Sequence, residues 1–152
     1  MYKKILVPLD GSKRAERILP HVEKIALDNE ASTLFLKVVR PPIAAGYDDL
    51  QGAKFEKQLE ARLVEYTTYV KGIQGEFTAK GIKANHLVVA GSVISVILAV
   101  AHREDVDLVA MCSHGRGGLS RLFYGSVASG ILNRIDRALL IIRARQNGDN
   151  IS

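Results

Sequence analysis

The residues at 112–126, CSHGRGGLSRLFYGS, combine glycines, hydroxyls and basic side chains in a pattern that favours anion binding. The apolar run DLVAMC at 107–112 leads into this segment, and a connection from a strand to a helix usually needs only about two to six residues. Glycine lets the main chain approach a ligand closely, and backbone N–H groups beside a helix start at Gly125 and Ser126 suit a phosphate. The segment therefore predicts a site for a phosphate-bearing ligand, with a plain glycine-rich connection as the alternative.

A second short motif, LDGS at 9–12, follows the first apolar run and supplies a carboxylate. Ligands of open α/β sheets bind beyond the carboxyl ends of the strands, where the winding direction reverses. If the first and fourth strands are neighbours, Asp10 lies beside the glycine-rich segment in that crevice. Asp10 then has two interpretations: it contacts the sugar or base edge of a ligand, or it is a capping residue just before the helix at Ser12.

Short apolar runs rich in β-branched residues predict strands, and the stretches between them predict helices. The strands are expected at 3–9, 32–39, 84–90, 107–112 and 138–143, and the helices at 12–28, 50–73, 92–104 and 125–135. Their alternation predicts an α/β fold, a doubly wound five-stranded parallel sheet with strand order 3-2-1-4-5 and helices on both faces, as in Rossmann-like proteins. Pro20 predicts a kink or a late start in the first helix. The helix after Ser92, its expected N-cap, is apolar on most sides and should be largely buried.

The composition, with 47% hydrophobic and 24% charged residues among 152, is that of an ordinary soluble globular protein. We expect a single domain at 1–145 and a flexible C-terminal tail at 146–152. The single cysteine, Cys112, excludes an internal disulfide and fits a reducing compartment.

Charge and hydropathy limit the classes of partner. The start MYKKILVPLDGS does not have the form of a signal peptide, and no later apolar run is long enough to cross a bilayer. We therefore expect a cytoplasmic protein without a membrane partner. The net charge of +5 is scattered and is not interleaved with aromatic residues, so no nucleic-acid partner is expected.

The motifs KKILVPLDGS and DLVAMCSHGRGGLSRLFYGSVAS, with five strands in α/β order, resemble the nucleotide-binding subgroup of the universal stress protein family. The ATP-binding pattern of that family is Gly, two residues, Gly, nine residues, Gly, then Ser or Thr. Gly115, Gly125 and Ser126 match this pattern, whereas Cys112 stands where the first Gly is expected. If that position requires positive φ, a cysteine is strained there, and if it requires only a close approach to phosphate, the Cβ and sulfur of Cys112 add bulk. The departure then either weakens binding, changes the preferred nucleotide or has no effect.

The resemblance implies an adenine nucleotide as ligand: ATP, or else ADP or AMP, with Mg²⁺ carried by the nucleotide. Ser126 is implied both to cap the last helix and to donate to a phosphate, and the side chains of His114 and Arg116 are expected to contribute without acting as catalysts. No catalytic residue and no metal site built by the protein are expected. The implied binding residues are Pro8, Leu9, Asp10, Val38, Met111, Cys112, His114, Gly115, Arg116, Gly125, Ser126, Val127 and Ala128.

The function implied is that of an ATP-binding stress-response regulator with at most slow hydrolysis. One alternative is a dimeric interaction protein that binds no nucleotide because of Cys112; another is an enzyme that cleaves ATP at the α-phosphate. The absence of a GxxxxGKS or GxxxxGKT phosphate loop weighs against fast catalysis. The apolar run at 138–143, at one edge of the expected sheet, favours a homodimer, with a covering loop or tail as the alternative.

Overall fold

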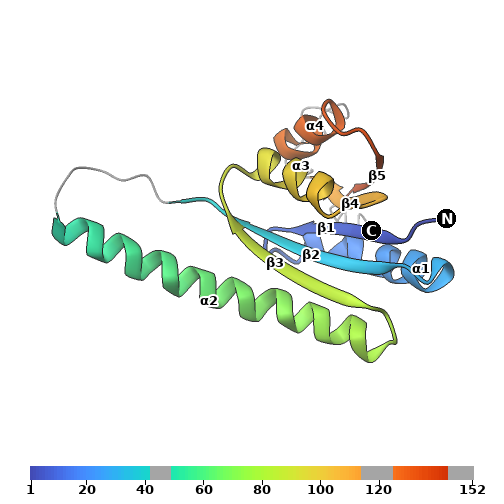
Figure 1. Ribbon diagram of the computed structural model, residues 1–152, viewed down its shortest axis with the longest axis horizontal. Coiled ribbons are helices and arrows are strands. Elements are labelled where there is room, and N and C mark those ends of the chain that lie inside the picture. The colour runs from blue at the N-terminus through green and yellow to red at the C-terminus, as the bar shows by residue number, and fades with distance from the viewer. Residues whose placement is uncertain (42–48, 114–124, 144–152) are drawn as a thin grey trace, which may run out of the picture.

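A computed structural model describes residues 1–41, 49–113 and 125–143, which form a five-stranded parallel sheet with helices on both faces (Figure 1). The strands are β1 (Lys4–Leu9), β2 (Ser32–Val39), β3 (Ala84–Ala90), β4 (Leu108–Ser113) and β5 (Ala138–Arg143). They lie in the order β3-β2-β1-β4-β5 and pair in parallel, which confirms the predicted α/β fold and strand order.

The sequence of each strand matches its place in the sheet. Every residue of β2 after Ser32 is buried, and so is every residue of β4. Both are interior strands, and near-continuous apolar runs are typical of parallel strands covered on both faces. The outer strands β3 and β5 are only partly buried.

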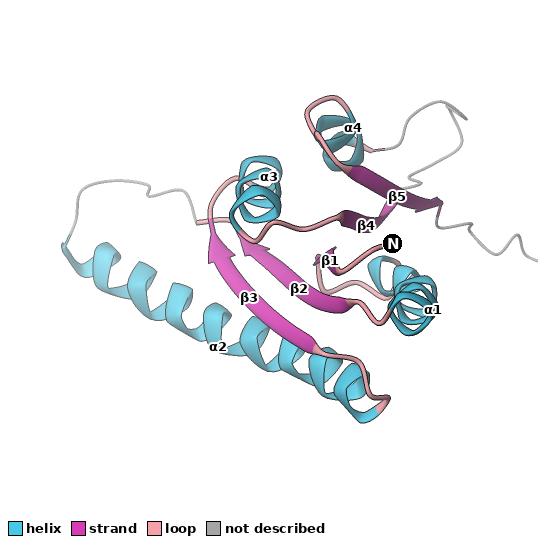
Figure 2. Cartoon of the chain, turned by 45° about the vertical axis from the view of Figure 1, so that its right-hand side comes forward, coloured by secondary structure: helices cyan, strands magenta, loops and turns pink. Residues whose placement is uncertain are grey.

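Two helices cover each face of the sheet (Figure 2). The helices α1 (Leu19–Asn29) and α2 (Asp49–Ala79) lie on one face, and α3 (Val93–Arg103) and α4 (Ser126–Leu132) lie on the other. Because successive strand residues point to opposite faces, Phe35 packs in the core beneath α1 and α2, while Leu36 packs in the core beneath α3 and α4.

The first helix starts late, as the position of Pro20 predicts. A short 3₁₀ helix, η1 (Ala15–Ile18), precedes α1, which begins at Leu19 with Pro20 in its first turn. Proline is tolerated there because the first N–H groups of an α-helix have no acceptor within the helix.

Helix α2 is longer than predicted, whereas α4 ends at Leu132, before the expected end at 135. Helix α2 extends to Ala79, past the expected end at 73, and continues through Gly72 and Gly75. Its second half is held by burial of Val70, Ile73 and Phe77 against the sheet, which outweighs the low helix propensity of glycine.

The prediction that α3 is largely buried is confirmed in part. Its residues Ile97, Val100 and Ala101 are buried and its other large apolar residues are partly buried against the same core, whereas Ser95 and Ala99 are exposed. The helix lies on the outside of the sheet and packs on it with the buried residues. Ser92 does occupy the N-cap position, but its side chain makes no capping hydrogen bond.

Asp107 joins the start of β4 to the N-terminal strand and should make stability depend on pH. Its Oδ2 accepts hydrogen bonds from the backbone N–H groups of Lys3 (2.7 Å) and Lys4 (2.8 Å), which hold the pKa of its carboxyl below the usual value. In acid the unfolded state therefore binds more protons than the folded state. The stabilisation is complete at neutral pH and is lost as the pH falls below about 4. Urea unfolding between pH 6 and pH 2 should show a smaller loss on acidification for Asp107→Asn than for the wild type, and equal losses would contradict this role.

Candidate functional site

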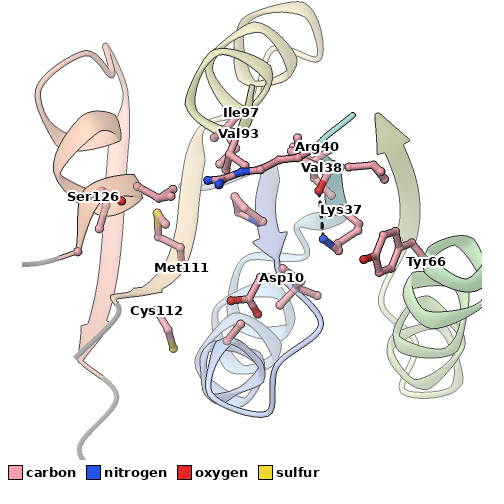
Figure 3. Close-up of a pocket in the computed structure, with 18 of the residues that line it drawn as sticks. Asp10, Lys37, Val38, Arg40, Tyr66, Val93, Ile97, Met111, Cys112 and Ser126 are labelled. Carbon is pink, nitrogen blue, oxygen red and sulfur yellow. Dashed lines mark hydrogen bonds between the residues drawn. The ribbon is translucent and has the colours of Figure 1, made fainter. Parts of the chain in front are cut away.

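A cavity of about 360 Å³ lies at the carboxyl ends of β1, β2 and β4 (Figure 3). The strand order reverses its direction at β1, with β2 on one side and β4 on the other. Open α/β sheets bind ligands beside such a reversal. All predicted binding residues within the described part of the chain line it, whereas His114, Gly115 and Arg116 lie outside the described residues. The predicted residues in its wall are Pro8, Leu9, Asp10, Val38, Met111, Cys112, Gly125, Ser126, Val127 and Ala128.

Asp10 supports the turn after β1 and also lines the cavity. Its Oδ1 accepts a hydrogen bond from the Ser12 N–H at 2.8 Å, and Ser12 Oγ in turn accepts one from the Ala15 N–H at 3.1 Å. Such a turn holds the carboxylate in a fixed position at the end of the strand. Asp10 closes this turn and does not cap a helix, because the first helical segment begins only at Ala15. Its placement in the cavity wall leaves the ligand contact as a prediction.

Gly125 sets the path of the chain into α4. Its φ of 77° and ψ of 157° are essentially accessible only to glycine, and it occupies the N-cap position of the helix. The expectation that Ser126 caps α4 was wrong, because Gly125 occupies the N-cap position and Ser126 is the first helical residue. The hydroxyl of Ser126 is thus not committed to capping the helix.

Cys112 takes the place of the first motif glycine without backbone strain. It lies within β4, and its φ is not positive. The thiol is buried on the face covered by α1 and η1, and burial raises its pKa. A thiol with a raised pKa is a poor nucleophile at neutral pH, so this environment does not favour redox chemistry.

Lys37 and Tyr66 line the cavity but were not predicted as site residues. Lys37, near the end of β2, is 9% exposed and is the one charged residue classed as buried in the described part of the chain. Its Nζ lies 4.2 Å from the centre of the Tyr66 ring and donates a hydrogen bond to the Val38 carbonyl at 3.1 Å. Burial lowers the pKa of this ammonium and the charge of Arg40 adds to the effect, while Asp10 opposes it.

The charged side chains in the cavity wall are mainly basic. In the described residues the wall holds three cations, Lys37, Arg40 and Arg62, against the single carboxylate of Asp10. Arg40 extends from the end of β2 toward Val93 and Ile97 (Figure 3). It also borders a second, more open groove of about 400 Å³ at the start of α3. This balance favours an anionic ligand.

The described ranges contain neither a cluster of metal-ligating side chains nor a membrane-spanning helix. There, no three His, Cys, Asp or Glu side chains gather in a way that could hold a metal ion. Of the helices at 15–29, 49–79, 93–103 and 126–132, none is both long and apolar enough to span a membrane.

The fold and the position of this cavity define a class of α/β protein with a cavity at the switch point of its parallel sheet. The model of the universal stress protein family matches residues 1–143, so this chain belongs to that family. The resemblance inferred from the two motifs is thereby confirmed.

Particular relatives can also be named. The universal stress protein MJ0577 of Methanocaldococcus jannaschii is 27% identical over 159 residues, covering 97% of this chain and 98% of that protein. The solved structure of MJ0577 superimposes with a TM-score of 0.79 at 29% identity, covering 97% of this chain and 99% of that one.

Two more distant structures share the fold. A universal stress protein in complex with cAMP has a TM-score of 0.65 at 19% identity, covering 95% of this chain and 98% of that one. A family protein of Arabidopsis thaliana with AMP bound has a TM-score of 0.65 at 14% identity, covering 98% and 96%.

Proposed function

We propose that this protein binds an adenine nucleotide, with ATP as the expected ligand and Mg²⁺ carried by it, and that the occupied state regulates a stress response in the cytoplasm. The observation that carries the proposal is the cavity at the switch point. Residues far apart in the sequence, chosen from two motifs and the end of the second strand, all border this one space. Its volume falls in the usual range for small-molecule sites.

The wall offers suitable groups for each part of a nucleotide. Val38, Ile97 and Met111 form an apolar side that suits the base. Asp10 supplies a carboxylate for a ribose hydroxyl. Gly125 and Ser126 supply close backbone approach and a hydroxyl for phosphate oxygens.

The family members with bound nucleotides support the same ligand class. One was solved in complex with cAMP and another with AMP, so the fold accommodates adenine nucleotides in at least those proteins. A binding role is favoured over rapid catalysis, because Asp10 is the single carboxylate in the described wall and is already held in a turn. Phosphoryl transfer requires groups that hold Mg²⁺ and orient the nucleophile.

We also propose a homodimer through β5. This strand lies at the edge of the sheet, and Leu139, Leu140, Ile141 and Ile142 are only partly buried. An apolar edge strand of this kind is an aggregation hazard unless it is covered. Sedimentation equilibrium should show a dimer, and Ile141→Lys should shift it to monomer; a wild-type monomer would contradict the interface.

Identification of bound small molecules tests the nucleotide proposal. Mass spectrometry of compounds released from fresh protein should detect an adenine nucleotide, and calorimetry should show binding of AMP, ADP and ATP, the last with and without Mg²⁺. Ser126→Ala should weaken ATP binding about tenfold, because a hydrogen bond to a charged phosphate is lost. Ser129→Ala, in the same helix but outside the cavity wall, is the matched control.

An empty protein that also binds none of the three nucleotides would overturn the proposal. The protein would then be better described as a dimeric interaction protein of the same family. Equal losses of ATP affinity in Ser126→Ala and Ser129→Ala would instead show that the Ser126 hydroxyl does not contact the nucleotide.

A further inference from the structure

The cavity extends onto both faces of the sheet at the end of β2. Val38 packs in the core beneath α3 and α4, and its neighbour Lys37 points to the opposite face, where α2 lies. On that face the wall includes Arg62 and Tyr66 of α2, and the side chains of Asp10, Lys37 and Tyr66 border the same space (Figure 3). We call the part bordered by Asp10, Lys37, Arg62 and Tyr66 the α2-side lobe.

The ammonium of Lys37 is the main binding group of this lobe. Lysine is almost never buried without a partner, because removing its charge from water is costly. Among the described residues, the one hydrogen-bond acceptor of Lys37 Nζ is the Val38 carbonyl, and the Tyr66 ring supplies a cation–π contact. An ammonium has three donors, so Lys37 retains the capacity to donate to a ligand oxygen.

The surrounding charge determines which ligand group fits. Arg62 adds a second cation from α2, and Arg40 adds a third at the mouth of the cavity. Asp10 is the only opposing charge in the described wall, and its Oδ1 already accepts the Ser12 N–H. An anionic group on the ligand would complete the neutralisation of Lys37 with a charge-assisted hydrogen bond.

We propose that the α2-side lobe is a subsite for a second phosphate, carried on the ribose of an adenine nucleotide that also has a 5′-phosphate. This inference rests on the proposed nucleotide site, in which Asp10 contacts the ribose. In dinucleotide sites a carboxylate at this place contacts the ribose hydroxyl, and a nearby cation accommodates a phosphate on that hydroxyl. Here Lys37 is buried, the charge of Asp10 acts on it, and Arg62 also lines the cavity.

Comparison of matched ligands tests the subsite. Isothermal titration calorimetry at constant ionic strength would measure AMP, adenosine 2′,5′-bisphosphate and adenosine 3′,5′-bisphosphate against the full chain. At least one bisphosphate should bind about tenfold more tightly than AMP, as expected for one added charge-assisted hydrogen bond. A mixture of AMP and inorganic phosphate, at the same concentration as the bisphosphate, tests whether a free phosphate can replace the one attached to the ribose. This mixture should not reproduce the gain in affinity.

Variants test whether the higher affinity for a bisphosphate than for AMP depends on Lys37. In Lys37→Met the ratio of bisphosphate to AMP affinity should fall to about one, whatever the affinity for AMP itself becomes. Lys71→Met removes the same charge from an exposed position of α2 outside the cavity wall, and should keep the wild-type ratio.

Equal affinities of AMP and both bisphosphates for the wild type would overturn the subsite while leaving the proposed nucleotide site intact. That comparison needs no variant, so it remains decisive if Lys37→Met fails to fold. A wild-type preference that persists in Lys37→Met would also overturn the assignment to Lys37. Failure of every nucleotide to bind would overturn the proposed function and the subsite together.

Discussion

Replacing Phe77 by alanine is expected to lower the free energy of unfolding by about 3–5 kcal/mol, the range for truncating a buried aromatic residue. Phe77 is 2% exposed, and its ring meets that of Phe35 edge to face with centroids 4.8 Å apart. It attaches the second half of α2 to the sheet. Because a domain of this size is stable by only about 5–15 kcal/mol, the loss would be a large part of the total.

Urea unfolding monitored by circular dichroism would measure the effect of Phe77→Ala. Val64→Ala, at a position of α2 that is 68% exposed, should change stability by less than about 0.5 kcal/mol and is the control for a truncation in the same helix. A loss for Phe77→Ala no greater than that of the control would show that the aromatic pair does not hold α2 in place.

Gly125→Ala is expected to cost about 1–3 kcal/mol of stability and to weaken nucleotide binding. With φ at 77° and ψ at 157°, an alanine Cβ would be strained in the native backbone. Relief of that strain would shift the start of α4, where Ser126 and Val127 line the cavity. Urea unfolding and calorimetry with AMP would measure the two effects.

Gly72→Ala is the matched control for this substitution. Gly72 lies inside α2 with open space where a Cβ would be, so alanine there should stabilise the protein by about 0.5–1 kcal/mol. If Gly125→Ala were as stable as the wild type, the backbone at that position would not require glycine. If it lost stability but kept its affinity for AMP, the start of α4 would not contribute to the site.

The sheet could be predicted from the sequence because its strands carry their own signal. The bounds of β2, β3 and β5 agree with the apolar runs at 32–39, 84–90 and 138–143. The end of α2 could not be predicted in this way. Gly72 and Gly75 suggest a stop, and the helix continues because residues beyond them, such as Phe77, bury against distant strands. Tertiary packing of this kind outweighs local propensity.

The cavity wall could be predicted only where its residues belong to local sequence motifs. Pro8, Asp10, Met111 and Ser126 belong to recognisable motifs at strand ends or a helix start, so their positions follow from the topology. Tyr66 has the helical spacing of a core residue, and its contact with Lys37 depends on how α2 crosses the sheet.

Lys37 did leave a signal that could have been used. It is the only charge in the run STLFLKVV, and a lysine inside a strand buried on both faces needs a specific reason. The alternation of the strand alone does not reveal that its side chain ends at a ligand cavity rather than in solvent.

The two sides of the cavity differ in how the chain holds them. The buried side chains of α2 among those described, Val70, Ile73 and Phe77, all follow Tyr66 and Arg62, whereas β1, β2 and β4 form the centre of the sheet. Amides in central strands exchange with solvent only on global unfolding, while sparsely packed helical turns open locally at little free-energy cost. The wall formed by β1, β2 and β4 therefore belongs to the part of the fold that is expected to open last. Local opening of α2 around Arg62 and Tyr66 is expected to cost less free energy.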